Sequence, residues 1–428
     1  MKLWDKGLKI DRIIENFTVG NDREIDMYIA KYDVQASLAH AEMLCSCGYL
    51  TTEEFSQLRE GLQKLESQIE NGSFQIEESF EDVHSKIEYE LTQTYGDVGK
   101  KIHTARSRND QVLVALHLYY KESILEIKEL INKLFDSLIQ LADHHKEKLL
   151  PGYTHLQVAM PSSFGMWFSS YAELLIDDMI VLNSALKVVD QNPLGSAAGY
   201  GSSFQINREE TTKLLDFNTL KYNSVAAQMS RGKSERTIAN ALSSVGYTLS
   251  KFAMDVCLYM SQNFGFITFP NELTTGSSIM PHKKNPDVFE LLRASGNKVQ
   301  ALSSEIQFIT NNLPSGYHRD FQLLKEPMIN GIEKTKEILA IFDYSIQQII
   351  IKSIDFQNDN YKYLSSVDSV NELVQEGKSF REAYQIVGKA IEEGTYTFSD
   401  SATHTHEGSI HNLSLDKIVA KMRKLGSL

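Results

Sequence analysis

Cysteine is scarce in this sequence, which contains only Cys45, Cys47 and Cys257. An odd number does not favour a disulfide framework, and none of the spacings is that of a zinc site or a Cys-x-x-Cys redox motif. The starting segment Met-Lys-Leu-Trp-Asp-Lys also lacks the apolar core of a secretion signal. These absences favour reduced thiols and a cytoplasmic protein.

A long apolar run is missing as well. The longest stretch without Lys, Arg, Asp or Glu is 149–172, and Pro151, Gly152 and Pro161 interrupt it, so no membrane helix is predicted. Basic residues are outnumbered, with 43 Lys and Arg against 56 Asp and Glu and a net charge of −13. This balance argues against a general nucleic-acid binder and against binding to an anionic membrane. Cations that bind an anionic substrate must then be local.

Proline is confined to one part of the chain. All eight prolines fall between Pro151 and Pro327, between long periodic segments, where they mark helix boundaries. No alternating pattern is long enough to predict a β-sheet, and there is no internal repeat. At 428 residues the chain exceeds the size at which one core keeps growing, so two or three domains or subregions are expected.

The first hundred residues predict short helices. Apolar residues recur at helical spacing over 34–47, and Gly48 is a suitable stop. Thr51 and Glu54 then open a second helix through about residue 70, before an Asn-Gly pair. This part of the chain is therefore a small helical region.

Longer helices follow. From 107 to about 148 the apolar positions keep a 3.6-residue period without a break. Some 38 residues at 1.5 Å each give a rod of roughly 55 Å, longer than one ordinary globular domain requires. Similar periodic segments are expected at about 161–190, 233–263, 287–311 and 324–352.

The segment 161–190 is apolar on more than one face, so it needs partners on several sides. We expect a long helix bundle that continues into other subunits; the alternative is an isolated monomeric bundle. The predicted fold class is all-α with three helical regions: an N-terminal helical domain over 1–106, a central long-helix domain over 107–354, and a small C-terminal helical domain over 355–428.

The segment 276–287, Gly-Ser-Ser-Ile-Met-Pro-His-Lys-Lys-Asn-Pro-Asp, must be a loop. Its hydroxyl groups, on Ser277 and Ser278, are possible proton-transfer groups, and Lys283 and Lys284 are cations for a developing negative charge. A solvated basic surface turn is the alternative interpretation of the same residues.

Three other polar breaks lie beside the long helices. The first, 103–110, reads His-Thr-Ala-Arg-Ser-Arg-Asn-Asp, and it can cap a helix or bind a carboxylate at the helix N-terminus. The second, 152–157, carries His155, a natural proton-transfer group that is also often structural. The third, 192–203, is a glycine-rich loop that can approach a ligand or simply turn the chain. A His-Thr-His run near 405 has no further ligand at suitable spacing, so no metal site is predicted.

These segments together resemble a known family. Gly-Ser-Ser-x-Met-Pro-x-Lys-x-Asn-Pro is similar to the signature loop of the fumarase/aspartase superfamily, whose lyases release fumarate by β-elimination. Ser-Arg-Asn-Asp at 107–110, Gly-Tyr-Thr-His-Leu-Gln at 152–157 and Pro-Leu-Gly-Ser at 193–196 resemble its argininosuccinate lyases. Further matches are the Glu-Asp-x-His stretch at 81–84, Tyr-x-x-Asp-x-Gln-x-x-Lys at 317–325 and Phe-Arg-Glu-Ala at 380–383.

The resemblance implies an all-α homotetramer whose central helices form a twenty-helix bundle. It implies active sites shared between subunits, each assembled from three distant segments of three different chains. The small-molecule substrate would be argininosuccinate, cleaved to arginine and fumarate in the last step of arginine biosynthesis. No cofactor or metal is expected.

The resemblance also implies roles for individual residues. Ser277 would abstract the proton, with Ser278 as its neighbour, and Lys283 and Asn285 would stabilise the aci-carboxylate intermediate. His155, paired with Glu290, would act as an acid or orient substrate carboxylates. The substrate-binding residues would be Arg108, Asn109 and Thr154 for the succinyl part, Tyr317, Gln322 and Lys325 for the arginine part, and in addition Ser107 and Arg231.

The sequence departs from the family pattern in several places. Asp22 stands near the position of a substrate-binding serine, Ala105 replaces a glycine, and His282 replaces a glutamine. Met-Ser-Arg-Gly at 229–232 replaces Ser-Asp-Arg-Asp. His282 keeps an adenylosuccinate lyase as an alternative, because Pro-His-Lys-x-Asn is common there. A crystallin-like structural protein of the same fold is the alternative outside enzymes, although the retained site residues argue against it.

Overall fold

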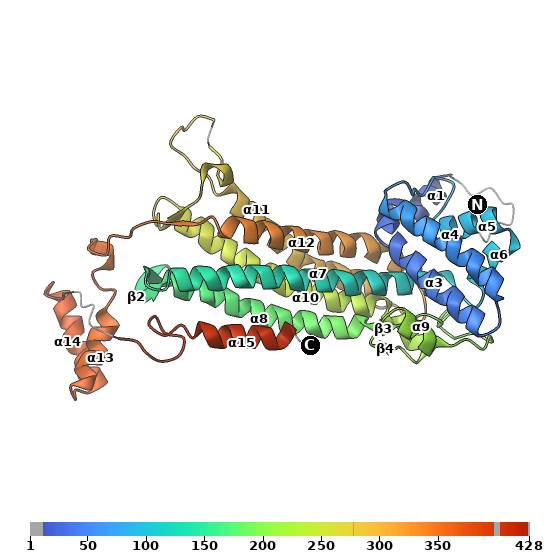
Figure 1. Ribbon diagram of the computed structural model, residues 1–428. Coiled ribbons are helices and arrows are strands. Elements are labelled where there is room, and N and C mark those ends of the chain that lie inside the picture. Colours follow the sequence, from blue (N-terminus) through green and yellow to red (C-terminus); the bar gives the residue numbers. More distant parts are fainter. Residues whose placement is uncertain (1–11, 277, 398–402, 427–428) are drawn as a thin grey trace. The chain divides into compact units, whose positions relative to one another are not determined.

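The computed structural model describes residues 12–276, 278–397 and 403–426, and its regular structure is mainly helical, which confirms the predicted all-α fold class (Figure 1). The N-terminal helices are α1 (Arg12–Val19), α2 (Asp22–Ile25), α3 (Ala30–Ser46), α4 (Thr52–Glu70), α5 (Val83–Tyr95) and α6 (Asp97–Lys100). The long helices are α7 (Arg108–His144), α8 (Phe164–Val189), α10 (Ser224–Met260), α11 (Asp287–Thr310) and α12 (Lys325–Ile346). The remaining α-helices are α9 (Arg208–Leu214), α13 (Ser366–Gln375), α14 (Phe380–Glu392) and α15 (Leu415–Gly426).

The chain forms two compact units, and both draw on three separate parts of the sequence. Unit 1 takes its described residues from 12–128, 181–246 and 298–336, and unit 2 from 129–180, 247–297 and 337–426. All five long helices contribute one segment to each unit. The three regions predicted from the sequence are a different division, which stays a prediction.

Capping residues mark the end of α3 and the start of α4, as predicted, whereas α3 begins at Ala30, before the predicted residue 34. Gly48 has φ +80° just after α3, a conformation that favours glycine. Thr51 caps α4 in a capping box: its side chain accepts from the Glu54 N–H, and the Glu54 carboxylate accepts from the Thr51 N–H. Both signals are local, which is why the sequence alone was sufficient to place these two helix ends.

The core of unit 2 is rich in aromatic side chains. Tyr171 of α8 and Phe252 of α10 stack with ring centroids 4.0 Å apart, and Phe342 of α12 lies 4.8 Å from Phe252. Burial of each such ring stabilises the fold by about 1.5–3 kcal/mol. Trp167 and Tyr171 donate to the same Asp255 oxygen at 3.1 and 2.6 Å, so their polar atoms are satisfied.

A two-stranded hairpin in unit 2 corrects the prediction that no sheet would form. Strand β1 (Leu149–Thr154) pairs antiparallel with β2 (Gln157–Ser163), with Pro151 opposite Pro161. Its two-residue loop is His155-Leu156, with φ +55° and +59°. Two-residue hairpin loops favour Asn-Gly, which this turn lacks, and proline is rare in strands. The sequence pattern therefore did not predict the hairpin. The other strands are two-residue pairs: β3 (Gln191–Asn192) with β4 (Thr219–Leu220), and β5 (Ile267–Thr268) with β6 (Ile350–Ile351).

Helix α10 is interrupted near its start. Arg231 (φ −61°, ψ +129°) and Gly232 (φ +84°, ψ −42°) have non-helical backbone inside the run from Ser224 to Met260. The predicted helix start at residue 233 therefore coincides with the second, regular part of α10. Helix α12 ends earlier than the predicted 352, because Ile350 and Ile351 form β6.

The C-terminal helices follow the predicted amphipathic pair. α13 and α14 are joined around Gly377, which has φ +98° and reverses the chain. Val370, Ala383 and Val387 form their shared core. Among the residues described, every helix is too short or too polar to span a bilayer.

Candidate active site

A cavity of about 460 Å³ in unit 1 gathers side chains of both charges. Its walls come from the N-terminal helices, the start of α7, the interrupted part of α10, and the 3₁₀ helix η4 (Arg319–Leu324) with the residues that flank it. The lining residues are Asp22, Asp26, Glu81, Asp82, His103, Arg106, Ser107, Arg108, Asn109, Val112, Leu113, Gln228, Arg231, Tyr317, Arg319, Gln322 and Lys325.

Seven of the predicted substrate-binding residues line this one cavity. They come from three separate parts of the sequence, yet all lie in unit 1. They are Ser107, Arg108, Asn109, Arg231, Tyr317, Gln322 and Lys325. The fold therefore brings together the residues that the motifs predicted separately, while their roles stay predictions.

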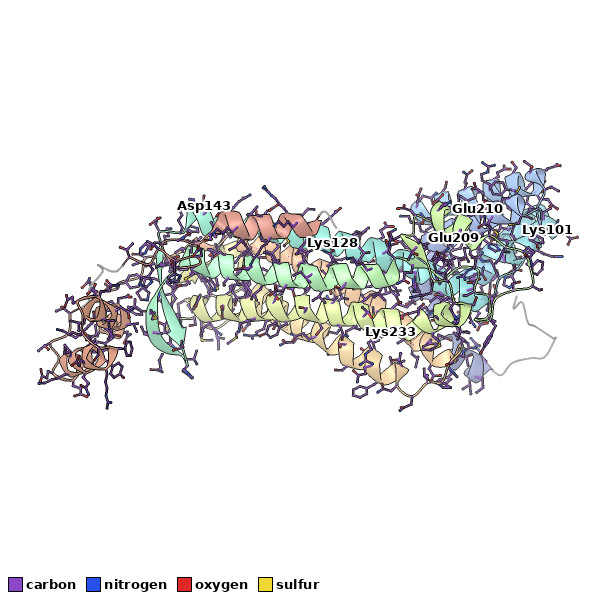
Figure 2. The ribbon with its side chains drawn as sticks, turned by 90° about the horizontal axis from the view of Figure 1, so that it is seen from below. Lys101, Lys128, Asp143, Glu209, Glu210 and Lys233 are labelled. Carbon is purple, nitrogen blue, oxygen red and sulfur yellow. The ribbon has the colours of Figure 1, made fainter. Side chains whose placement is uncertain are left out.

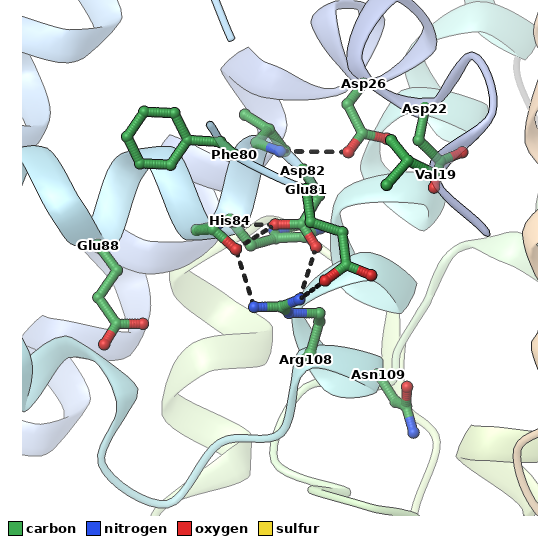
Figure 3. Close-up of polar contacts among 12 residues, drawn as sticks. Val19, Asp22, Asp26, Phe80, Glu81, Asp82, His84, Glu88, Arg108 and Asn109 are labelled. Carbon is green, nitrogen blue, oxygen red and sulfur yellow. Dashed lines mark hydrogen bonds and ion pairs between the residues drawn. The ribbon is translucent and has the colours of Figure 1, made fainter. Parts of the chain in front are cut away.

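Arg108 is the first residue of α7, and carboxylates hold its guanidinium in place. Its Nη1 lies 3.0 Å from Asp82 Oδ2 and 3.4 Å from Glu81 Oε2, and its Nη2 donates to Ser85 Oγ at 2.8 Å (Figure 3). Burial raises the pKa of Asp82, but the nearby His84 and Arg108 cations outweigh it and the pKa is lowered. Asp82 is therefore a charged partner that fixes the direction of Arg108.

His84 forms a second buried pair close to Asp82. Its Nδ1 lies 3.0 Å from Asp33 Oδ2, and both side chains are almost fully buried. Burial lowers the pKa of His84, but the Asp33 and Asp82 carboxylates outweigh that effect and raise it. The two carboxylates thus favour the charged form of His84.

Lys325 forms the centre of a second charged group. Its Nζ lies 2.6 Å from Asp26 and 2.9 Å from Asp22, and the residue is 4% exposed. Burial lowers the pKa of Lys325, but Asp26 and Asp22 outweigh it and the pKa is raised. Burial also raises the pKa of Asp22 to about 6, against the opposing charge of Lys325. Asp22, the residue near the position of the family's serine, is thus part of the pocket.

Sequence reasoning did not assign several residues of this pocket to the site. Arg319 donates to the Thr18 carbonyl at 2.8 Å and to Glu81 Oε1 at 3.1 Å. Gln228 is 1% exposed, and its Oε1 has no hydrogen-bond partner among the described residues. Arg319 lies inside the recognised 317–325 motif, and Gln228 precedes Arg231 by three residues. Spacing to an already predicted residue was the available signal in both cases.

A cavity of about 650 Å³ in unit 2 contains predicted residues of the serine loop. Lys283, Asn285 and Glu290 all line it, together with His282. The backbone of Asn285 donates to the Thr275 carbonyl at 2.9 Å, which closes the base of the loop. Glu290 lies in the first turn of α11. Lysine and amide donors thus line one cavity, and their role in stabilising an anionic intermediate stays a prediction.

The remaining predicted site residues are exposed or lie outside the described residues. Ser278 is exposed, and Ser277 is outside the residues that the structure describes. Thr154 and His155 are exposed at the turn of the β1–β2 hairpin. Within the described part of the chain, no hydrogen bond or ion pair joins His155 to Glu290. The pairing of these two residues stays a prediction.

In the described part of the polar C-terminal tail, the histidine run contacts an acidic residue of α13. His404 lies 2.8 Å from Asp368 Oδ1. In the described ranges, no group of three or more His, Cys, Asp or Glu side chains is placed to hold a metal ion.

Comparison with known proteins gives a consistent result. Residues 6–301 match the protein family described as Lyase. Argininosuccinate lyase of Bacteroides fragilis is 52% identical over 423 residues, which are 99% of this chain and 95% of that protein. Argininosuccinate lyase of Thermotoga neapolitana is 42% identical over 388 residues, which are 91% of this chain and 98% of that protein.

A solved structure shares the fold. EDDS lyase in complex with formate aligns with a TM-score of 0.77 at 21% identity, over 98% of this chain and 92% of that one. The match to the argininosuccinate lyase of Bacteroides fragilis thus spans almost the whole chain. By these relationships, the chain belongs to the argininosuccinate lyase family of lyases.

Proposed function

We propose that this protein cleaves argininosuccinate to arginine and fumarate by a cofactor-free β-elimination, the last step of arginine biosynthesis. The observation that carries the proposal is the pocket of unit 1, in which predicted substrate-binding residues from distant parts of the sequence line one cavity. Kinship with argininosuccinate lyases over 99% of the chain supports the same reaction.

The charges of this pocket suit the proposed substrate. Argininosuccinate carries carboxylates at both ends, together with a guanidinium and an amino group. Arg108, Arg231 and Lys325 supply cations, and Asp22 and Glu81 supply carboxylates that can bind the cationic groups. We assign the succinyl part to Arg108, Asn109 and Thr154, with Ser107 nearby. The arginine part goes to Tyr317, Gln322 and Lys325.

The chemical step needs a base and a site for negative charge. Ser277 takes the proton from the carbon next to a carboxylate, and the electron pair moves into that carboxylate to form an aci-carboxylate. Lys283 and Asn285 stabilise this doubly charged group. The electron pair then returns to form the C=C bond of fumarate, and the C–N bond to the guanidinium breaks with its electrons going to the guanidino nitrogen of the departing arginine. His155, oriented by Glu290, is placed in the acid or orienting role, with Ser278 beside the base.

A serine is a poor base at its ordinary pKa, so the loop must activate it. The lysine and amide groups of the 276–287 loop are the local candidates, because they favour an alkoxide. In this proposal the protein is a cytoplasmic homotetramer with a twenty-helix bundle. Three segments from different subunits then form each site.

Fumarate release, followed by ultraviolet absorbance, tests the proposal. Purified protein is offered argininosuccinate and adenylosuccinate in parallel, because His282 lines the unit 2 cavity and belongs to a Pro-His-Lys-x-Asn run that is common in adenylosuccinate lyases. Release from argininosuccinate alone is the expected result. Release from adenylosuccinate alone would move the function to that substrate, and release from neither would favour a crystallin-like structural role.

A further inference from the structure

Glu235 lies at the break in α10 and binds three different groups. Its Oε1 lies 3.0 Å from Arg231 Nε and accepts from the Tyr120 hydroxyl at 3.3 Å. Its Oε2 accepts from the Gly232 N–H at 2.6 Å. Glu235 therefore caps the regular part of α10 and holds the side chain of Arg231 with the same carboxylate.

Arg231 connects this carboxylate to η4. Its Nη2 donates to the Phe321 carbonyl at 2.8 Å, while its Nε faces Glu235. Phe321 is the third residue of η4, directly before Gln322. The guanidinium thus joins the break in α10 to the backbone that carries Gln322 and, three residues further on, Lys325.

The pair is buried, so its geometry is tightly constrained. Glu235 is 1% exposed and Arg231 is 5% exposed. Removal of one charge from a buried pair leaves the other unpaired in a poorly solvated place. Gly232 leaves little room for rearrangement, because a Cβ there would lie 3.0 Å from Thr310 Cγ2 and 3.2 Å from Phe321 Cε1.

We propose that Glu235 is a positioning residue for the arginine part of the substrate: it holds Arg231, and Arg231 holds η4 so that Gln322 and Lys325 face the pocket together. Glu235 does not line the pocket, whereas Arg231, Gln322 and Lys325 do. It therefore acts through Arg231. The inference rests on the proposed function, because it names the substrate part that this arrangement serves.

The test uses Glu235→Gln in the full-length protein. The amide keeps the shape and one acceptor for the Gly232 N–H, but it removes the negative charge that pairs with Arg231. We expect KM for argininosuccinate to rise about tenfold while kcat changes less than about threefold. The contacts that are lost bind the substrate and the transition state equally, so their loss raises KM and leaves kcat nearly the same. The inhibition constant of L-arginine should rise by a similar factor, while that of succinate changes less than about twofold.

Selectivity between the two inhibitors separates positioning from a purely structural role. A general loosening of the pocket would weaken succinate and L-arginine equally, and that result would overturn the inference. So would unchanged inhibition by both. Thermal unfolding and size-exclusion chromatography establish that the variant compared is folded.

Two matched controls come from the same unit. Glu333 accepts from the Tyr119 hydroxyl at 3.1 Å much as Glu235 accepts from Tyr120, and neither lines the cavity, but Glu333 pairs with Lys336 at 2.9 Å where Glu235 pairs with Arg231. Glu333→Gln should leave both inhibition constants unchanged. Lys233→Gln removes an exposed charge two residues before Glu235 and should also have no effect (Figure 2).

A second variant keeps the inference testable if Glu235→Gln does not fold. Arg231→Lys keeps the positive charge beside Glu235, but one ammonium cannot reproduce the separate Nε and Nη2 contacts. The same selective loss of L-arginine inhibition is expected, and equal inhibition by arginine and succinate would contradict it. Turnover by the unmodified protein is measured first. If it releases no fumarate from argininosuccinate, the proposed function fails, and calorimetric binding of L-arginine to both proteins still decides the role of Glu235.

Discussion

Lys325 is a buried lysine whose ammonium group lies between Asp22 and Asp26. The Lys325→Met substitution would leave both carboxylates unpaired, and breaking a buried pair in this way typically costs about 3–5 kcal/mol. We expect that loss in urea unfolding at pH 7, with a smaller loss at pH 5 because Asp22 is then mostly protonated. The exposed Lys100 pairs with Asp97 on the surface, so Lys100→Met should leave the unfolding free energy unchanged. Equal losses for the two variants would contradict the prediction.

His117 is neutral in the folded protein because it is buried. Burial lowers its pKa to about 4, and its Nδ1 lies 3.0 Å from the Val189 carbonyl. The unfolded chain binds a proton near pH 6.5 and the folded chain only near pH 4. Stability is therefore complete above about 6.5 and falls as the pH decreases towards 4, by at most about 3 kcal/mol from this residue.

His117→Asn should flatten the unfolding free energy between pH 6.5 and 4 relative to the unmodified protein. The exposed His406 provides the comparison, since His406→Asn should leave the slope as it is. A slope that is unchanged in His117→Asn would show that other groups cause the acid sensitivity.

At this scale, pocket residues that belong to short, specific sequence motifs could be predicted. Arg108, Gln322 and Lys325 were identified from the sequence and do line one pocket. Their neighbours were harder to find: Asp26 contributes through a contact with a lysine 299 residues away, which no local pattern encodes. The same holds for the Glu235 carboxylate, whose partner Tyr120 is 115 residues distant.

At the scale of the element, the capping box of α4 is a local device with a measurable effect. Thr51→Ala removes the acceptor for the Glu54 N–H and should destabilise the protein by about 1 kcal/mol. Thr51→Ser keeps the hydroxyl and should be close to neutral. Thermal unfolding of the two variants checks this, and equal melting temperatures would show that tertiary packing alone holds the start of α4.

At the break in α10, the backbone conformation and not a side-chain cap determines which residue is accepted. Gly232 has φ +84°, so Gly232→Ala combines an unfavourable conformation with crowding against Thr310 and Phe321. We expect a loss of about 1–3 kcal/mol in the unfolding free energy. Gly388→Ala in α14, where a Cβ would meet nothing within 4 Å, is the matched control and should be neutral or stabilising. Similar losses at both positions would contradict the argument.

Helices were predicted from periodicity and caps, whereas the hairpin was not. Long apolar stripes placed α7, α8 and α11 to within a few residues, since that signal is repeated over many turns. The β1–β2 hairpin has prolines in its strands and His155-Leu156 at φ values that usually select asparagine or glycine. Hydrogen bonds between its strands determine the structure there, and side-chain pattern carries little information about them.

At the scale of the whole molecule, the proposed shared active sites predict complementation. Asn109→Ala alters the unit 1 pocket, and Ser277→Ala removes the proposed base in the serine loop. Each variant alone should lose most activity, but tetramers reassembled from an equal mixture should regain roughly a quarter of it, because some sites then draw both intact segments from different chains. Mixed tetramers identified by two affinity tags, yet inactive, would contradict shared sites.

The interruption of α10 also affects which insertions and deletions this protein can accept during evolution. An α-helix turns by about 100° per residue, so an insertion normally rotates everything that follows it. Because the backbone leaves the helical conformation at Arg231 and Gly232, the phase of 233–260 is set independently of 224–230. Insertions or deletions ahead of the break can therefore reshape one wall of the pocket while the apolar face of the following helix keeps its register. Sequence changes that alter the pocket wall and sequence changes that alter helix packing can therefore occur in separate stretches of the same helix.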